Sequence, residues 1–153
     1  MLTDDEKTEI MKEITQHPYK RAACVEAMKI VQKYRGWVSD EMRDIAKLLD
    51  MTPAEIEGVA TFFSHIYTKP LGKHVIFVCD SISCWVAGYE CVRDYISKSL
   101  GVRLGETTAD GQFTLMPIAC LGICEHAPAM LIDGELYTDL NPEKIDEILK
   151  RYE

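Results

Sequence analysis

The chain has 153 residues, of which 47% are hydrophobic, so it can form a packed core as one domain or two small ones. Its 25 acidic and 17 basic residues give a formal net charge of -8. Such a surface repels phosphate backbones, which argues against nucleic acid as a partner.

The chain contains no apolar run that approaches the roughly 20 residues needed to cross a bilayer, so direct membrane insertion is not expected. The N-terminal segment Met1–Glu6 is acidic and is not followed by an apolar stretch, unlike a secretory signal. We therefore expect a cytoplasmic protein. Six cysteines in a reducing compartment indicate metal ligands or redox groups rather than structural disulfides.

The first sixty or so residues predict a series of helices. Thr3 and Glu6 form a capping box, and Thr52, Pro53 and Glu55 give a second strong start signal. Proline at position 18 separates the first helix from the second, which is expected to stop near position 36. The apolar residues at helical spacing are Ile10, Met11, Ile14; Ala27, Met28, Val31, Tyr34; Met42, Ile45, Ala46, Leu49; and Ile56, Val59, Ala60, Phe63.

The remainder of the chain predicts strands mixed with helices, after a Pro- and Gly-containing linker at 67–73. Residues 75–78 and 113–118 read as strands, 85–100 as one helix, and 129–137 as a hairpin around Asp133 and Gly134. A last helix is expected after Asn141. The predicted fold is α+β, with a small helical bundle over residues 1–66 and a domain of thioredoxin-like order over residues 67–153.

Four of the cysteines form two pairs that follow predicted strands. Cys79 and Cys84 are spaced C-x4-C at the end of the first strand, and Cys120 and Cys124 are spaced C-x3-C after the second. If these strands are parallel neighbours, their ends are adjacent and the four sulfurs meet. A two-iron cluster needs four thiolates, two for each iron, and two separated pairs supply them.

Residues between the ligands suit such a site. Gly122 permits backbone conformations that other residues resist and leaves room near a bulky cluster. Backbone N–H groups around Ser81 and Ser83 could point at the sulfurs and tune the reduction potential.

The pair spacings alone leave other interpretations open. A structural zinc site also uses four thiolates with similar spacings. A thioredoxin-like dithiol enzyme normally has C-x-x-C, which neither pair has. Four unrelated buried cysteines are disfavoured because both pairs fall in loops.

The remaining thiols and the histidine near the second pair are interpreted as structural or solvated. Cys24 shares an apolar helical stripe and is expected to be a small buried hydrophobe. Cys91 is separated from Cys84 by about 10 Å along one helix, too far to share a small cluster. His126 is expected to be a solvated loop residue, because four thiolates are already present.

The aromatic residues Trp85, Tyr89 and Tyr95 are explained by core packing of an amphipathic helix, although they could also line an electron path. The sequence contains no Gly-rich phosphate loop, nucleophile motif or paired-carboxylate arrangement. The chain is therefore not expected to bind NADH or flavin by itself.

Residues 78–84 and 120–128 resemble the two cluster-binding segments of the thioredoxin-like [2Fe–2S] subunits of respiratory complex I, called the E subunit in bacteria. Residues 57–63 and 110–115 look like further landmarks of that family. The resemblance runs from about Arg21 to the C-terminus. It makes zinc a minor alternative.

The resemblance implies that Cys79, Cys84, Cys120 and Cys124 are ligands of one [2Fe–2S] cluster. It further implies a partner flavoprotein, the F subunit, that binds NADH and FMN and carries a [4Fe–4S] cluster. This chain would then be a non-catalytic electron-transfer subunit of NADH-quinone oxidoreductase, peripheral to the cytoplasmic face of the inner membrane. The same module occurs in NAD-linked hydrogenases and formate dehydrogenases, which remain alternative hosts. Four thiolates and an acidic surface predict a low reduction potential.

Overall fold

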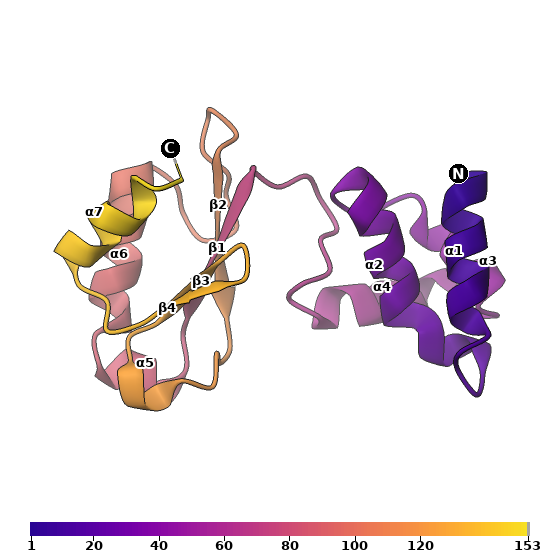
Figure 1. The fold of residues 1–153 in the computed structure, drawn as a ribbon, viewed down its shortest axis with the longest axis horizontal. Helices are drawn as coiled ribbons and strands as arrows, with labels where there is room; N and C mark the ends of the chain where they lie inside the picture. Colours follow the sequence, from indigo (N-terminus) through magenta and orange to yellow (C-terminus); the bar gives the residue numbers. More distant parts are fainter. Residues whose placement is uncertain (153) are drawn as a thin grey trace. The chain divides into compact units, whose positions relative to one another are not determined.

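A computed structural model describes residues 1–152, and the chain divides into two compact units, Met1–Pro70 and Leu71–Glu153 (Figure 1). The first unit contains α1 (Asp4–Ile14), the 3-10 helix η1 (Lys20–Ala23), α2 (Cys24–Arg35), α3 (Met42–Leu48) and α4 (Pro53–Phe62). The second contains β1 (His74–Cys79), α5 (Ile82–Val86), α6 (Tyr89–Leu100), β2 (Phe113–Ile118), η2 (Cys124–His126), β3 (Met130–Ile132), β4 (Glu135–Tyr137) and α7 (Pro142–Leu149).

Both predicted capping boxes of the helical unit are confirmed. The Glu6 carboxylate accepts the Thr3 N–H at 2.7 Å, and the Thr3 hydroxyl accepts the Glu6 N–H at 3.3 Å. At the start of α4, Thr52 and Glu55 make the same reciprocal pair at 2.7 and 3.2 Å. These bonds satisfy N–H groups that have no partner within the helix, so local residues set where α1 and α4 begin.

The core of the helical unit lies around α2, which contacts α1, α3 and α4. Its largest fully buried side chains are Ile10, Met28, Ile45, Leu49 and Ile56.

Three residues of the predicted apolar stripes are instead exposed: Met11 (48%), Tyr34 (52%) and Phe63 (42%). Phe63 lies one residue beyond α4, where the backbone is extended, so helical spacing no longer directs it inward. Tyr34 turns outward and donates its hydroxyl proton to Glu9 at 2.9 Å.

A buried ion pair inside the helical unit was not predicted. Glu6 is only 1% exposed, and the Arg35 guanidinium donates to its carboxylate through Nε at 2.6 Å and Nη2 at 2.7 Å. These bonds, together with those from Thr3, lower the pKa of Glu6 to about 2. The first helix is thereby tied to the end of α2.

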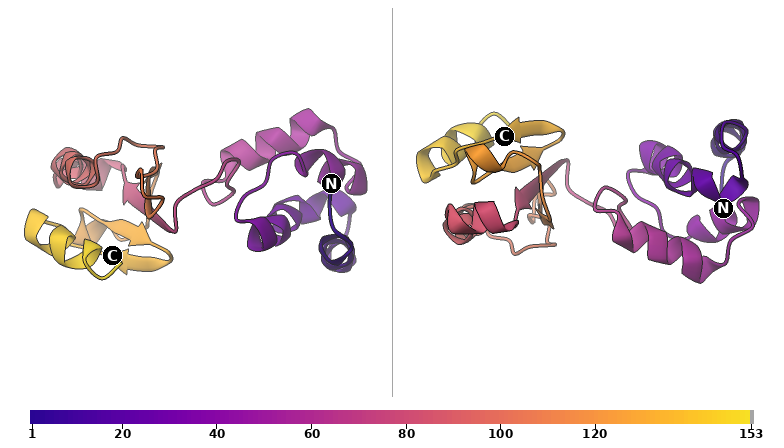
Figure 2. Two further views of the ribbon diagram at one scale, coloured as in Figure 1. Left: turned by 90° about the horizontal axis from the view of Figure 1, so that it is seen from above. Right: turned by 90° about the horizontal axis from the view of Figure 1, so that it is seen from below.

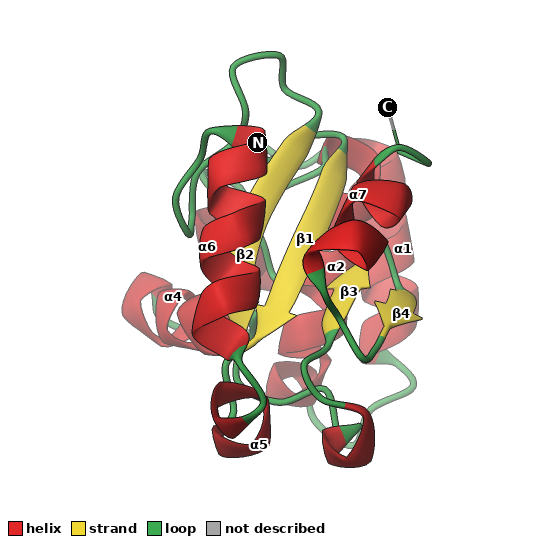
Figure 3. Cartoon of the chain, turned by 90° about the vertical axis from the view of Figure 1, so that its left-hand side faces the viewer, coloured by secondary structure: helices red, strands yellow, loops and turns green. Residues whose placement is uncertain are grey.

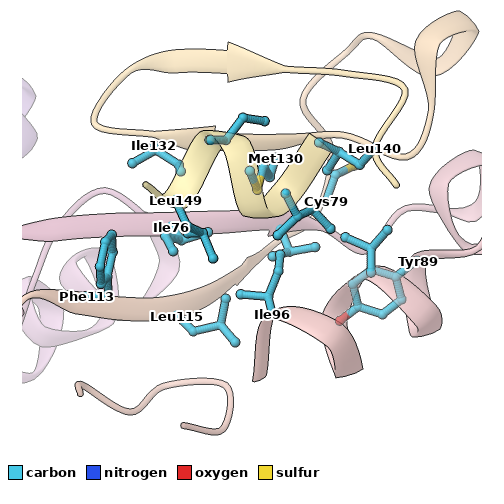
Figure 4. Packing of buried hydrophobic residues seen from close by; sticks show 14 of the residues in the cluster. Ile76, Cys79, Tyr89, Ile96, Phe113, Leu115, Met130, Ile132, Leu140 and Leu149 are labelled. Atoms are coloured by element: carbon cyan, nitrogen blue, oxygen red, sulfur yellow. The ribbon is translucent and has the colours of Figure 1, made fainter. Parts of the chain in front are cut away.

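The second unit is built on a four-stranded sheet of order β2-β1-β3-β4. β1 and β2 are parallel, with Cys79 opposite Ile118, whereas β3 is antiparallel to both β1 and β4. The helices α6 and α7 cover the same face of this sheet (Figures 2 and 3). Buried Ile76, Leu115, Ile96 and Ile132 fill the space between them (Figure 4).

The chain enters this sheet through a close approach at Gly72. Its N–H donates to the Thr114 hydroxyl at 2.6 Å, and a Cβ at this position would lie 2.9 Å from the carbonyl carbon of Phe113. Only glycine fits here without a shift of backbone.

The single helix predicted over residues 85–100 is wrong in one respect: the structure has two helices, α5 and α6, divided at Gly88. Gly88 has φ +104°, a conformation that an α-helix cannot contain. Trp85, expected in the core, lies on the short α5 and is 55% exposed, whereas Tyr89 on α6 is buried.

Of the helices that the structure describes over residues 1–152, none is long and apolar enough to cross a membrane.

Candidate metal centre

The first cysteine pair lies at the carboxyl end of β1 and in the helix that follows. Cys79 is the last residue of β1 and Cys84 lies within α5; their exposed fractions are 3% and 2%. The Cys79 N–H donates to the Ala129 carbonyl at 3.1 Å, which holds this strand end against the segment before β3. Both thiols are therefore fixed on the inner side of the site.

In the second pair, Cys120 lies in the loop after β2 and Cys124 is the first residue of η2; both thiols are exposed. Gly122 has φ +78°, and its N–H points back at the Cys120 sulfur at a distance of 3.3 Å. A side chain at this position would make that conformation costly. This N–H is the largest of the influences that lower the pKa of Cys120, so the loop favours the thiolate.

The four thiols come together because β1 and β2 are parallel neighbours, the arrangement on which the sequence prediction depended. Burial, and then a hydrogen bond with Cys79, raises the pKa of Cys84 to about 11, and Cys124 adds to this effect. Cys120 in turn interacts with both Cys79 and Cys124. Thiols that are far apart in the sequence thus influence one another's pKa values.

The four cysteines divide into two pairs, which is the division that a two-iron cluster needs. Within residues 1–152, no three His, Cys, Asp or Glu side chains are arranged to hold one metal ion. A structural zinc site gathers four donors around one centre, whereas a [2Fe–2S] cluster divides its thiolates between two irons. One pair lies at the end of β1 and in α5, and the other lies after β2, with a backbone N–H aimed at Cys120; this division fits the second arrangement.

Cys24, Cys91 and His126 are the other residues that the sequence analysis considered. Cys24 is buried in the helical unit, and burial raises the pKa of its thiol. Cys91 is an exposed free thiol on α6, beyond the break at Gly88. His126 is exposed, and its Nδ1 lies 3.2 Å from the Asp139 carboxylate. The peptide bond before Pro128, whose isomer the sequence did not reveal, is cis.

An apolar surface beside the cysteines was missed by sequence reasoning. The α5 residues Ile82, Trp85 and Val86 are 71%, 55% and 76% exposed, although they flank buried Cys84. We define these three side chains as the α5 patch. The signal that could have revealed it was Gly88, because a break there separates α5 from the helix that covers the sheet.

The family model for the thioredoxin-like [2Fe-2S] ferredoxin matches residues 10–153. The chain belongs to this family. The E subunit of NADH-quinone oxidoreductase from Pseudomonas aeruginosa is 45% identical over 153 residues, covering 99% of this chain and 92% of that protein. The Escherichia coli protein of the same name is 45% identical over 152 residues, with the same coverage. The resemblance inferred from residues 78–84 and 120–128 is confirmed.

Among solved structures, an NAD+-reducing [NiFe]-hydrogenase in the H2-reduced state is similar with a TM-score of 0.69 and 22% identity. The match covers 85% of this chain and 22% of that one. This likeness concerns the fold. Together with the family match, it confirms the α+β architecture with a thioredoxin-like [2Fe–2S] ferredoxin domain.

Proposed function

We propose that Cys79, Cys84, Cys120 and Cys124 hold one [2Fe–2S] cluster in an electron-transfer subunit of NADH-quinone oxidoreductase. The observation that carries the proposal is the meeting of two cysteine pairs at the adjacent ends of parallel β1 and β2. Membership of an iron–sulfur family and the names of the 45% identical relatives support it.

The two cysteine pairs would hold the cluster from different sides. Cys79 and Cys84 supply thiolates from the packed side, where Tyr89 and Met130 contribute to the same apolar core and exclude water. Cys120 and Cys124 supply thiolates from the exposed loop, which leaves one side of the site open to a partner. When bound, the cluster takes and gives single electrons, whereas FMN accepts an electron pair from NADH.

We propose that the partner is a flavoprotein, the F subunit of the same complex, which binds NADH and FMN and carries a [4Fe–4S] cluster. Its docking surface on this chain is the α5 patch, because a partner that exchanges electrons must approach the cysteines closely. Exposed Ile82, Trp85 and Val86 adjoin Cys84 and form an apolar surface suited to a permanent contact between subunits. The assembled protein would then lie at the cytoplasmic face of the inner membrane.

Spectroscopy on anaerobically purified protein tests the cluster. We expect a brown protein that bleaches with dithionite and contains about two irons and two sulfides per chain. A colourless protein with about one zinc, which also fails to take up iron and sulfide, would overturn the proposal.

Co-expression with the flavoprotein tests the partner. We expect a stable complex in which NADH bleaches the cluster absorption of this chain, while NADH added to this chain alone has no effect. A hydrogenase or formate dehydrogenase component recovered in place of the flavoprotein of NADH-quinone oxidoreductase would assign the chain to another host.

A further inference from the structure

An apolar groove lies between the starts of α6 and α7, the two helices that lie side by side over the sheet (Figure 3). Its volume is about 240 Å³. The lining comes from both helices and from the loops that precede them, and includes Gly88, Cys91, Tyr95, Pro128, Leu140 and Pro142. The groove therefore belongs wholly to the second unit and is formed by residues other than the four proposed ligands.

The size and polarity of the groove favour an apolar side chain over a cofactor. Small-molecule sites usually measure roughly 300–1,000 Å³ and add convergent polar groups to apolar walls. This groove is smaller, and two of its polar groups are already engaged. The Tyr95 hydroxyl donates to the Asp146 carboxylate at 2.8 Å, and the Asn141 side-chain oxygen accepts the Lys144 N–H at 2.8 Å. One large apolar side chain of another protein matches these walls, and such buried anchors supply most of the binding energy at interfaces.

The groove continues the α5 patch along the chain. Val86 is the last residue of that patch, and the next two residues, Ala87 and Gly88, line the groove. The patch and the groove thus form one apolar surface, exposed on α5 and hollowed between α6 and α7. A partner that covers the α5 patch also covers the groove.

The charges beside the groove indicate the chemistry of that partner. Three exposed carboxylates are sequence neighbours of lining residues on α6 and α7, namely Glu90, Glu143 and Asp146. None of the three forms an ion pair within residues 1–152, whereas the nearby Arg93 already pairs with Asp94 at 2.8 Å. Basic residues around an apolar anchor would complement these carboxylates and speed the association of the two proteins.

We propose that the groove between α6 and α7 receives one apolar side chain of the flavoprotein subunit, from a surface that carries basic residues around that side chain. This inference rests on the proposed function, because it extends the docking surface from the α5 patch to the adjoining groove. A hollow beside an exposed apolar patch fixes the orientation of the partner as well as its affinity, since the fit of shapes is closest at the core of an interface.

Cys91→Trp tests the groove by filling it from the α6 side, and Cys91→Ala is the matched control that leaves it open. Titration calorimetry of the cluster-loaded proteins with the purified flavoprotein should show at least roughly tenfold weaker binding for Cys91→Trp and parent-like binding for Cys91→Ala. Cluster absorption should be the same in all three proteins, because Cys91 is not a proposed ligand. Binding of the parent should weaken as the salt concentration rises.

Alkylation of Cys91 in the parent protein gives a second readout, which does not depend on the folding of a variant. The exposed thiol should react with iodoacetamide in the free cluster-loaded protein, and complex formation should slow this reaction at least about tenfold. Mass spectrometry of the Cys91 peptide follows the reaction. Buried Cys24 is the control, because its reaction rate should not change on binding.

Parent-like affinity of a folded Cys91→Trp would overturn the inference and leave the proposed function intact, and so would unchanged alkylation of Cys91 in the complex. Protection of Cys91 that grows with the concentration of this chain alone would also overturn it, because the groove would then bind a second copy of the chain. If no complex with the flavoprotein forms at all, the proposed partner itself is wrong, and the inference falls with it.

Discussion

The two units of the chain differ in the groups that surround their acidic side chains. In the helical unit, the buried carboxylate of Glu6 has its own counter-charge in Arg35, which donates two hydrogen bonds to it. In the second unit, the sulfur of Cys120 is met by a neutral donor, the backbone N–H of Gly122 at 3.3 Å. The first unit supplies its own counter-charge to its buried carboxylate, whereas the four cysteines proposed as ligands would receive positive charge from a metal centre.

The largest effect is expected in the second unit, where Cys84→Ala should lose the cluster. Removal of a buried ligand leaves three thiolates for two irons, so bound iron and visible absorption should fall at least about tenfold. The helical unit should keep its structure, as followed by hydrogen exchange of α1 and α2. Cys91→Ala is the control and should retain the full iron content, since Cys91 lies beyond Gly88 on α6. Retention of two irons in Cys84→Ala would contradict the ligand assignment.

The next effect concerns the ion pair of the helical unit. The pKa of Glu6 is lowered from 4.5 to about 2, so the ionised pair stabilises the fold above pH of about 4.5. This contribution, at most about 3 kcal/mol, is lost as the pH falls through about 2. Glu6→Gln should lower the free energy of unfolding by about that amount at pH 7 and flatten its dependence on pH in that acidic range.

The control for Glu6→Gln is Glu9→Gln on the same helix. Glu9 pairs with Lys33 at the surface, where solvent screens the interaction, so its loss should have little effect. Chemical denaturation between pH 2 and pH 7 measures both variants. Equal losses in the two would show that burial of Glu6 does not matter.

Two Gly→Ala substitutions, one in each unit, are expected to change the free energy of unfolding in opposite directions. Gly72→Ala places a Cβ 2.9 Å from the Phe113 backbone, so it should destabilise the second unit by about 1–3 kcal/mol. Gly58→Ala lies in α4 with nothing within 4 Å, so it should stabilise the helical unit by about 0.5–1 kcal/mol. Thermal unfolding of the two variants checks the prediction, and a stabilising Gly72→Ala would contradict it.

An effect on binding, without a change in stability, is expected from the surface of the second unit. Trp85→Ala removes the largest side chain of the α5 patch, so it should weaken binding to the flavoprotein roughly tenfold while the cluster and the stability stay unchanged. Tyr19→Ala, 65% exposed in the helical unit, is the control. Titration calorimetry with the purified partner measures both; equal affinities for Trp85→Ala and the parent would exclude the α5 patch as the docking surface.

Features that depend on neighbouring residues could be predicted from the sequence. The starts of α1, α4 and α7 follow from Thr3, Thr52 and Asn141, because a cap and its helix lie within a few residues of each other. The strand at Phe113–Ile118 and the hairpin at Asp133 and Gly134 were also predictable, because each depends on residues that are close in the sequence. The spacing of the four cysteines, combined with a family resemblance, was enough to indicate a cluster.

Features that join distant segments required the folded structure. Burial of Glu6 depends on Arg35, 29 residues away, and the capping box with Thr3 gives no sign that the Glu6 carboxylate is buried. The segments that carry Cys79 and Cys120 lie side by side because parallel β1 and β2 end at the same register. Periodicity shows which face of a helix is apolar, but the pairing of strands determines which loops meet, and that pairing is set by contacts across the whole sheet.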